Sequence, residues 1–190
     1  PPFFEGGQHV QRFSRVISAL TAAAAIAATA GVVEAQAQDA TVASVKAIHD
    51  QVKGVIIKAA AQVPADKYSY RPTPEVRTFG QLFGHIANAS QMFCAAASGM
   101  KSPAAGDAEK LATKAELQKA VADAMTFCDH AFQMITSANA NESIELFGAK
   151  HSRVGALAFS NAHNYEHYGN LVTYLRMNGM VPPSSGGGGE

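Results

Sequence analysis

Residues 152–179 read SRVGALAFSNAHNYEHYGNLVTYLRMNG, and this stretch contains both ends of a long helix. Ser152 is a preferred N-cap residue and directly precedes a helical pattern. Gly179 supplies the left-handed conformation in which helices commonly end, and two prolines shortly after it prevent the helix from resuming. The sequence therefore predicts one helix that begins after Ser152 and ends near Asn178.

Two histidines lie on one face of this predicted helix. His163 and His167 are four residues apart, which places both imidazoles on one side of a helix, one turn apart. His85 belongs to a second helical segment, and helices packed side by side can bring three imidazoles to one point. Imidazole is a good ligand for divalent metals. The sequence thus predicts that His85, His163 and His167 bind a divalent ion: zinc, nickel or iron.

Three further segments have apolar side chains at the three- and four-residue steps typical of amphipathic helices. In chain order they cover about residues 40–62, 79–98 and 114–138. Asp39 is the expected cap of the first segment. Thr78 and Thr113 precede the other two, and each is followed three residues later by Gln or Glu, which completes a capping box.

Four helices of similar length predict an all-α fold, a four-helix bundle formed by residues 38–183. No alternating pattern typical of a strand persists along the chain. The connections are longer than tight antiparallel hairpins require, which is compatible with a crossover. The last connection contains a short segment, Ile144–Gly148, that we expect to cover one end of the bundle.

The two ends of the chain differ in composition from the predicted domain. Arg12 and Arg15 precede an alanine-rich apolar stretch that ends in Ala35-Gln36-Ala37, a pattern that signal peptidase accepts. We interpret residues 1–37 as a signal peptide with an upstream remnant, so that the mature protein is periplasmic or secreted. The apolar stretch is too weak for a stable membrane anchor. Residues 184–190 are predicted to be a flexible tail.

The overall charge excludes several classes of partner. The chain has 15 Lys and Arg against 15 Asp and Glu, a net charge of +0. Binding to nucleic acid or to an anionic membrane through bulk electrostatics is therefore not expected. The predicted domain, residues 38–183, is long enough to bury a core without metal or disulfide staples, so we expect the metal to serve chemistry. The sequence does not determine the oligomeric state, and a homodimer is compatible with it.

Three histidine ligands leave coordination positions for water or a substrate. The charge of the ion can lower the pKa of coordinated water to about 7, or it can ionise a thiol. A hydrolase or a thiol-dependent transferase acting on a small molecule would use such a site, and the alternative is a non-catalytic bundle that binds metal or a partner. A ferritin-like di-iron site is excluded because the chain has no Glu-x-x-His, and covalent haem because it has no C-x-x-C-H.

Three more polar residues are candidates for supporting roles around the metal. Asn88 lies three residues after His85, and Asn170 lies three residues after His167, so both amides are placed to orient ligands or bound water. Ordinary packing of buried amides explains both equally well. His49 lies in the apolar stripe of the first helix, and it is either an additional ligand or proton carrier, or a core histidine held by a hydrogen bond.

Cys94 and Cys128 are the two cysteines of the chain. They fall on helices that can be neighbours in a bundle, and an oxidising compartment would permit a disulfide between them. Two small thiols buried separately in a helical core explain them equally well. The sequence leaves both possibilities open.

Two stretches resemble a known family. HNYEHYGNLVTYLRMNGMVPP, residues 163–183, resembles the last helix of the DinB/YfiT-like family, whose pattern there is HxxxHxGxLxxYLRxxG followed by prolines. YRPTPEVRTFGQLFGH, residues 70–85, resembles the entry into that family's second helix. The resemblance implies a four-helix bundle with up-down-down-up topology and a divalent metal on His85, His163 and His167. The family includes thiol-dependent transferases and isomerases, and many members without a known reaction.

Overall fold

The structure is a computed structural model that describes residues 39–103 and 106–186. The predicted signal peptide, residues 1–37, and the last part of the predicted tail, residues 187–190, lie outside these ranges. None of the helices in the described ranges combines the length and the hydropathy that crossing a membrane requires.

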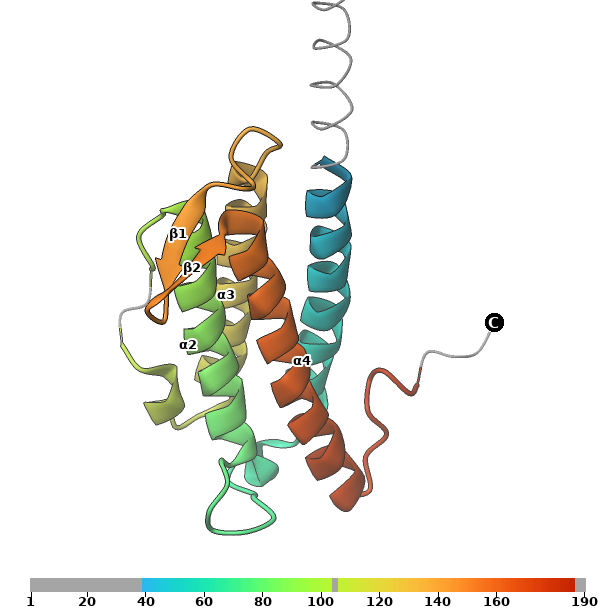
Figure 1. Ribbon diagram of the computed structural model, residues 1–190. Coiled ribbons are helices and arrows are strands. Elements are labelled where there is room, and N and C mark those ends of the chain that lie inside the picture. Colours follow the sequence, from blue (N-terminus) through green and yellow to red (C-terminus); the bar gives the residue numbers. More distant parts are fainter. Residues whose placement is uncertain (1–38, 104–105, 187–190) are drawn as a thin grey trace, which may run out of the picture.

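Four long helices pack side by side (Figure 1). The N-terminal helix covers residues 39–62 of the described chain. The labelled elements are η1 (Ala65–Lys67), α2 (Phe79–Ser98), η2 (Ala108–Lys110), α3 (Lys114–Met134), β1 (Ser143–Leu146), β2 (Ala149–Ser152) and α4 (Arg153–Met177). The predicted four-helix fold is confirmed, because the helices account for most of the described residues.

Hydrogen bonds at both ends of α2 and α4 fix the antiparallel alignment of these two helices. The side chain of Arg153, at the start of α4, donates to the carbonyl of Ala97 near the end of α2 at 2.7 Å. The hydroxyl of Tyr174, near the end of α4, donates to the carbonyl of Arg77 just before α2 at 2.9 Å. The two helices therefore cannot slide past each other without breaking one of these contacts.

The N-terminal helix is antiparallel to α3. Lys114, the first residue of α3, donates to the carbonyls of Ala61 and Val63, while Asp129 near the other end of α3 binds Lys53. Figure 1 shows that α2 and α3 run in the same direction, joined by the long connection that contains η2. The order of directions is up-down-down-up, as the family resemblance implies.

The predicted caps begin three of the four helices. Thr78 with Gln81 and Thr113 with Glu116 form complete capping boxes. The hydroxyl of Ser152 accepts from the backbone of the third residue of α4. The prediction that Asp39 caps the N-terminal helix is wrong, because Asp39 is itself helical.

The end of α3 and the segment after it differ from the prediction. The helix stops at Met134 and not near Ala138. The side chain of Asn139 donates to the carbonyl of Met134 and accepts from the backbone of Thr136, so the helix gives way to a turn. The predicted segment Ile144–Gly148 lies alongside α2 and α4, in the half of the bundle where α2 ends, and does not cover the end itself. It forms half of a β-hairpin that the all-α prediction did not include (Figure 1).

The hairpin has a two-residue turn between the paired residues Leu146 and Ala149. Both turn residues have positive φ, 53° for Phe147 and 74° for Gly148. Two positive φ values are characteristic of a type I′ turn, whose twist suits a hairpin. Glycine adopts this conformation readily, whereas phenylalanine rarely does. Because the usual Asn-Gly signal is absent and each strand has four residues, the sequence pattern gives little indication of this hairpin.

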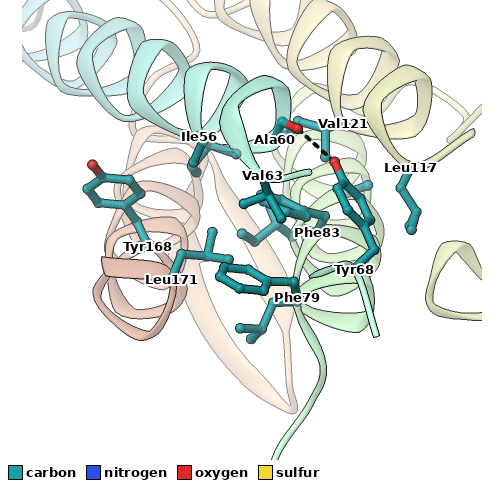
Figure 2. Close-up of a cluster of buried hydrophobic side chains, with 14 of the residues drawn as sticks. Ile56, Ala60, Val63, Tyr68, Phe79, Phe83, Leu117, Val121, Tyr168 and Leu171 are labelled. Atoms are coloured by element: carbon teal, nitrogen blue, oxygen red, sulfur yellow. Dashed lines mark hydrogen bonds between the residues drawn. The ribbon is translucent and has the colours of Figure 1, made fainter. Parts of the chain in front are cut away.

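Aromatic side chains fill the end of the bundle opposite the hairpin (Figure 2). Phe79 and Phe83 on α2 are fully buried, and the ring of Tyr68 lies 5.5 Å from that of Phe83. The Tyr68 hydroxyl donates to the carbonyl of Ala60 at 2.7 Å. Each fully buried phenylalanine contributes about 2 to 3 kcal/mol to stability, and the buried hydroxyl of Tyr68 has a partner.

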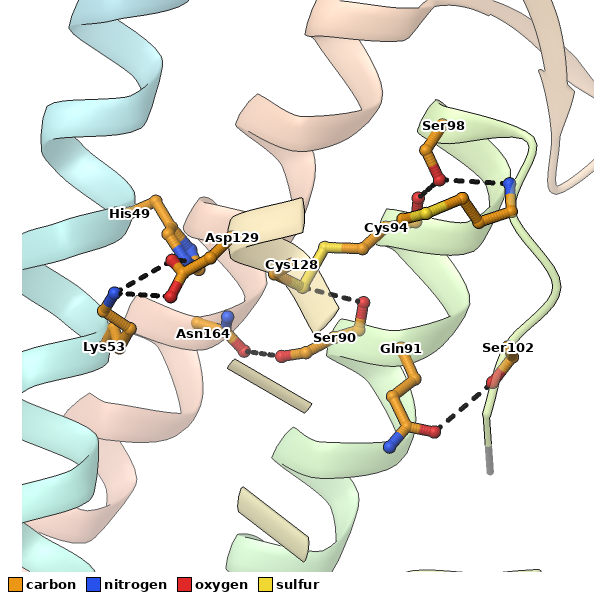
Figure 3. Close-up of a disulfide and its surroundings, with 11 residues drawn as sticks. His49, Lys53, Ser90, Gln91, Cys94, Ser98, Ser102, Cys128, Asp129 and Asn164 are labelled. Carbon is orange, nitrogen blue, oxygen red and sulfur yellow. Dashed lines mark hydrogen bonds and ion pairs between the residues drawn. A yellow bond between two sulfur atoms is a disulfide. The ribbon is translucent and has the colours of Figure 1, made fainter. Parts of the chain in front are cut away.

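A disulfide joins the two parallel helices α2 and α3 (Figure 3). Cys94 and Cys128 are bonded across a sequence separation of 34 residues. Both cysteines belong to a second cluster of buried side chains, near the hairpin, which also contains Phe93, Phe132 and Leu157. It closes a covalent ring around the whole connection that contains η2.

The Cys94→Ala/Cys128→Ala variant is expected to lose about 3 to 4 kcal/mol of unfolding free energy, because a ring of this size restricts the unfolded chain. Chemical denaturation of the oxidised protein and the double variant measures the difference. The midpoint of the double variant should be insensitive to a reducing agent, while that of the parent should fall. An equal midpoint for the parent with and without reductant would contradict the disulfide.

Candidate metal centre

The alignment of α2 and α4 brings the three predicted histidines together. His85 is on α2, and His163 and His167 are on α4. One ring nitrogen from each lies within 4.8 Å of the others. The Nε2 atoms of His85 and His163 are 3.2 Å apart. In a tetrahedral zinc site, ligand nitrogens about 2.0 Å from the metal are about 3.3 Å apart, so this spacing suits metal binding.

Among the three histidines, His167 gives the strongest indication that a metal ion binds here. Its Nε2 atom is buried and has no hydrogen-bond partner among the described residues. Its Nδ1 atom lies 3.3 Å from the side-chain nitrogen of Asn170. Buried polar atoms are nearly always paired, and a metal ion at the meeting point of the rings would pair with Nε2. The donor set therefore fits a divalent cation.

The electrostatics favour the neutral imidazoles that metal binding requires. Burial, with a further contribution from the nearby His163 and His85, lowers the pKa of His167 to about 4. Burial and the adjacent His85 also lower the pKa of His163. Both residues are thus neutral at pH 7 and present lone pairs without prior loss of a proton.

A carboxylate that the sequence analysis did not identify supports His85. Oε1 of Glu109, in η2, is 2.8 Å from Nδ1 of His85, and Oε2 accepts from Nε of Arg77 at 2.9 Å. Burial raises the pKa of Glu109, but the hydrogen bonds with Arg77 and His85 outweigh burial and the pKa lies below its usual value. An ionised Glu109 keeps the proton of His85 on Nδ1 and leaves Nε2 free for a metal.

Gly84 explains how η2 comes so close to α2. A Cβ atom at Gly84 would lie 2.5 Å from the carbonyl oxygen of Ala108 and 2.6 Å from the backbone nitrogen of Glu109. No side chain fits in this space, so glycine permits direct contact between the two backbones. That contact places Glu109 beside His85, the residue after Gly84. A glycine directly before a candidate ligand was the available sequence signal for this arrangement.

The two asparagines that were predicted to support the metal have different positions. Asn170 faces His167, as described above. Asn88 makes no hydrogen bond to an imidazole: its amide donates to Asp107 at 2.7 Å and accepts from the backbone of Ala108 at 3.0 Å. Asn88 therefore holds the segment that carries Glu109 and does not itself orient a ligand.

His49 has the contacts of a core histidine held by a hydrogen bond, the second of the two roles that the sequence left open, and these contacts are with α3 and not with the triad. Its ring is fully buried and lies 4.9 Å, between centroids, from that of Phe132. Figure 3 shows His49 beside Asp129, with 3.1 Å from Nε2 to Oδ1. Nζ of Lys53 binds both oxygens of Asp129, at 2.8 and 2.9 Å, and lies 3.5 Å from Asp50. The ammonium group already supplies the cation here, so these residues form an ion-paired core contact.

A family model for the DinB superfamily matches residues 48–171, a span that contains all three histidines. The chain belongs to the DinB superfamily. Two solved DinB-like proteins share its fold. The one from Bacillus subtilis is 20% identical, with 68% of this chain and 87% of that chain covered and a TM-score of 0.56. The one from Bacillus cereus is 17% identical, with 70% and 89% covered and a TM-score of 0.61. None of the curated proteins matches this chain.

In this DinB superfamily protein, Glu109→Gln is expected to weaken zinc affinity by about 10- to 100-fold, because an uncharged amide accepts the Nδ1 proton of His85 more weakly than a carboxylate does. Competition with a chromophoric chelator measures the affinity. Glu145→Gln, an exposed change on the hairpin, is the matched control and should bind zinc like the parent. Unchanged zinc affinity in Glu109→Gln would show that the carboxylate does not support the ligand.

His49 should make the metal-free protein less stable at mildly acidic pH. Burial lowers its pKa, an effect that Asp129 only partly opposes, so the unfolded chain binds more protons than the folded protein below about pH 6.5. The unfolding free energy should therefore fall as the pH drops from 6.5, by at most about 1.4 kcal/mol per pH unit from this residue. His49→Gln should flatten that slope in denaturation curves between pH 7 and 5. Parallel slopes for parent and variant would contradict this account.

Proposed function

We propose that this protein is an exported, metal-dependent enzyme that uses His85, His163 and His167 to hold a divalent ion: zinc, nickel or iron. The observation that carries the proposal is the buried, unpartnered Nε2 of His167 beside two further imidazoles, one of them backed by a carboxylate. A metal used only to hold the helices together is disfavoured, because the bundle has two buried apolar clusters and a disulfide of its own.

A divalent ion in this position would supply positive charge that lowers the pKa of a coordinated water or thiol. The residues of the chain prepare the site for that chemistry. Glu109 keeps the Nδ1 proton of His85, and Arg77 keeps Glu109 ionised and oriented. Phe93 packs against His163, with 5.5 Å between ring centroids, and gives that imidazole an apolar neighbour.

The nucleophile in this proposal is not a cysteine of the chain. Both cysteines of the protein are in the Cys94–Cys128 disulfide, so neither is available as a thiolate. A hydrolase would use water, and a thiol-dependent transferase would bring its thiol with a small-molecule substrate. The same disulfide supports our proposal of export to the periplasm or the medium, because disulfides persist in oxidising compartments.

Metal binding tests the proposal directly. The full chain, stripped with a chelator and dialysed against zinc or nickel, is expected to retain one ion per chain by elemental analysis. His163→Ala removes one of three ligands and should lower affinity by more than the about 10- to 100-fold that loss of an outer contact causes. His130→Ala, an exposed histidine on α3, is the matched control and should retain the ion.

Circular dichroism of each variant establishes that it is folded. Full retention of one ion by folded His163→Ala would overturn the three-histidine site. A cobalt-loaded sample whose visible spectrum does not respond to added azide would lack an exchangeable position, and the catalytic part of the proposal would then fail while the metal site remained.

A further inference from the structure

A cavity of about 470 Å³ lies beside the histidine triad, and its size is suitable for a small organic molecule. His85 and His163 line part of it. The large apolar side chains in its lining are Met92 and Phe93 of α2, Phe159 of α4 and Phe147 at the tip of the hairpin. The cavity thus combines two of the metal-binding imidazoles with a wall of large apolar side chains.

The lining of this cavity is unsuited to a charged ligand body. None of the described residues that line it is Asp, Glu, Lys or Arg. The remaining polar side chain, Asn88, already makes hydrogen bonds with Asp107 and the backbone of Ala108. A charged group placed against this wall would lose water without gaining a partner.

The three phenylalanine rings that line this cavity pack against one another. Phe93 is in edge contact with Phe147, at 5.7 Å and 84°, and lies 5.2 Å from Phe159. Phe93 itself is buried, whereas Phe147 is 68% exposed, Phe159 44% and Met92 40%. Apolar side chains that remain exposed together beside a polar site are typical of a binding surface, because a ligand there removes them from water. A further aromatic ring would make the same edge and offset contacts with these side chains.

The backbone at Phe147 also points to a binding role. Its φ of 53° is unfavourable for a bulky side chain, and the type I′ turn would be more stable with Asn at this position. The ring contacts Phe93 and Phe159, yet it stays 68% exposed, the largest exposed fraction among the large apolar side chains in the described part of the chain, so a ligand would bury much more of it. Strain of this kind is found where the side chain is used in binding.

We propose that this cavity binds the uncharged aromatic body of the substrate, whose short polar head reaches the metal at the histidine triad. The inference rests on the proposed function and adds the substrate class to it. It disfavours substrates with a charged body, such as a peptide-like thiol with free carboxylates.

Hydroxamate probes test the inference by binding, without any need to know the reaction. The zinc-loaded full chain is titrated with acetohydroxamate, benzohydroxamate and the monohydroxamate of succinate, and heat is measured. All three offer the same metal-binding group. Benzohydroxamate is expected to bind at least about tenfold tighter than acetohydroxamate, and the charged succinate derivative no tighter than acetohydroxamate.

Phe147→Asn separates binding from folding. Loss of the ring should weaken benzohydroxamate binding by about three- to tenfold and leave acetohydroxamate binding unchanged. The variant should remain folded, because the fit of Asn to the type I′ turn offsets the lost ring contacts with Phe93 and Phe159, and its melting temperature checks this. Lys150→Ala, an exposed change on the same hairpin, is the matched control and should not alter either affinity.

The outcomes distinguish this inference from the proposed function. Equal affinities for acetohydroxamate and benzohydroxamate would overturn the aromatic cavity while leaving an accessible metal in place. Unchanged benzohydroxamate binding in Phe147→Asn would likewise overturn it. If zinc is bound and no hydroxamate binds, the proposed exchangeable site fails, and the substrate inference fails with it.

Discussion

The candidate site depends on the fixed alignment of α2 and α4. Arg153 and Tyr174 anchor opposite ends of this helix pair through backbone carbonyls of Ala97 and Arg77. A shift of one helical turn is about 5.4 Å, more than the largest separation of the three ligand nitrogens. Arg77 contributes to both the helix alignment and the support of His85, because its carbonyl anchors α4 and its side chain holds Glu109. The alignment of the helices and the orientation of His85 are therefore linked through one residue.

The buried polar side chains of α4 destabilise the folded protein. Ser160, Asn161, Asn164 and His167 are all buried, and each leaves one side-chain atom without a partner among the described residues. Some of their other atoms are paired, for example Asn164 with the hydroxyl of Ser90 (Figure 3). Unpaired buried atoms each cost about 1 to 3 kcal/mol. The apolar clusters at the two ends of the bundle and the disulfide offset this penalty and allow the protein to keep polar side chains at its centre.

Local signals in the sequence predicted much of this structure. The caps at Thr78, Thr113 and Ser152 and the close approach of the three histidines follow from spacing along single helices and from the packing of amphipathic faces. Glu109 could not be predicted in this way, because its contact with His85 arises where η2 meets α2 across Gly84.

Two other features escaped prediction for physical reasons, and for His49 the sequence left two roles open. The early end of α3 depends on a side-chain contact from Asn139. The hairpin has a phenylalanine where a type I′ turn usually has asparagine. His49 follows the apolar pattern of its helix, but the helix faces α3 at that point, and Asp129 supplies its partner.

The Cys94–Cys128 link has a consequence for how the chain reaches its fold. Parallel helices such as α2 and α3 must find each other across a long connection, and searches of this kind are slow because the entropy of closing the loop is lost before contacts form. In the oxidised chain that closure has already taken place, and the connection containing Glu109 is confined to a small ring before any helix is stable. Oxidised protein should therefore refold faster than reduced protein, with the acceleration in the step that pairs these two helices.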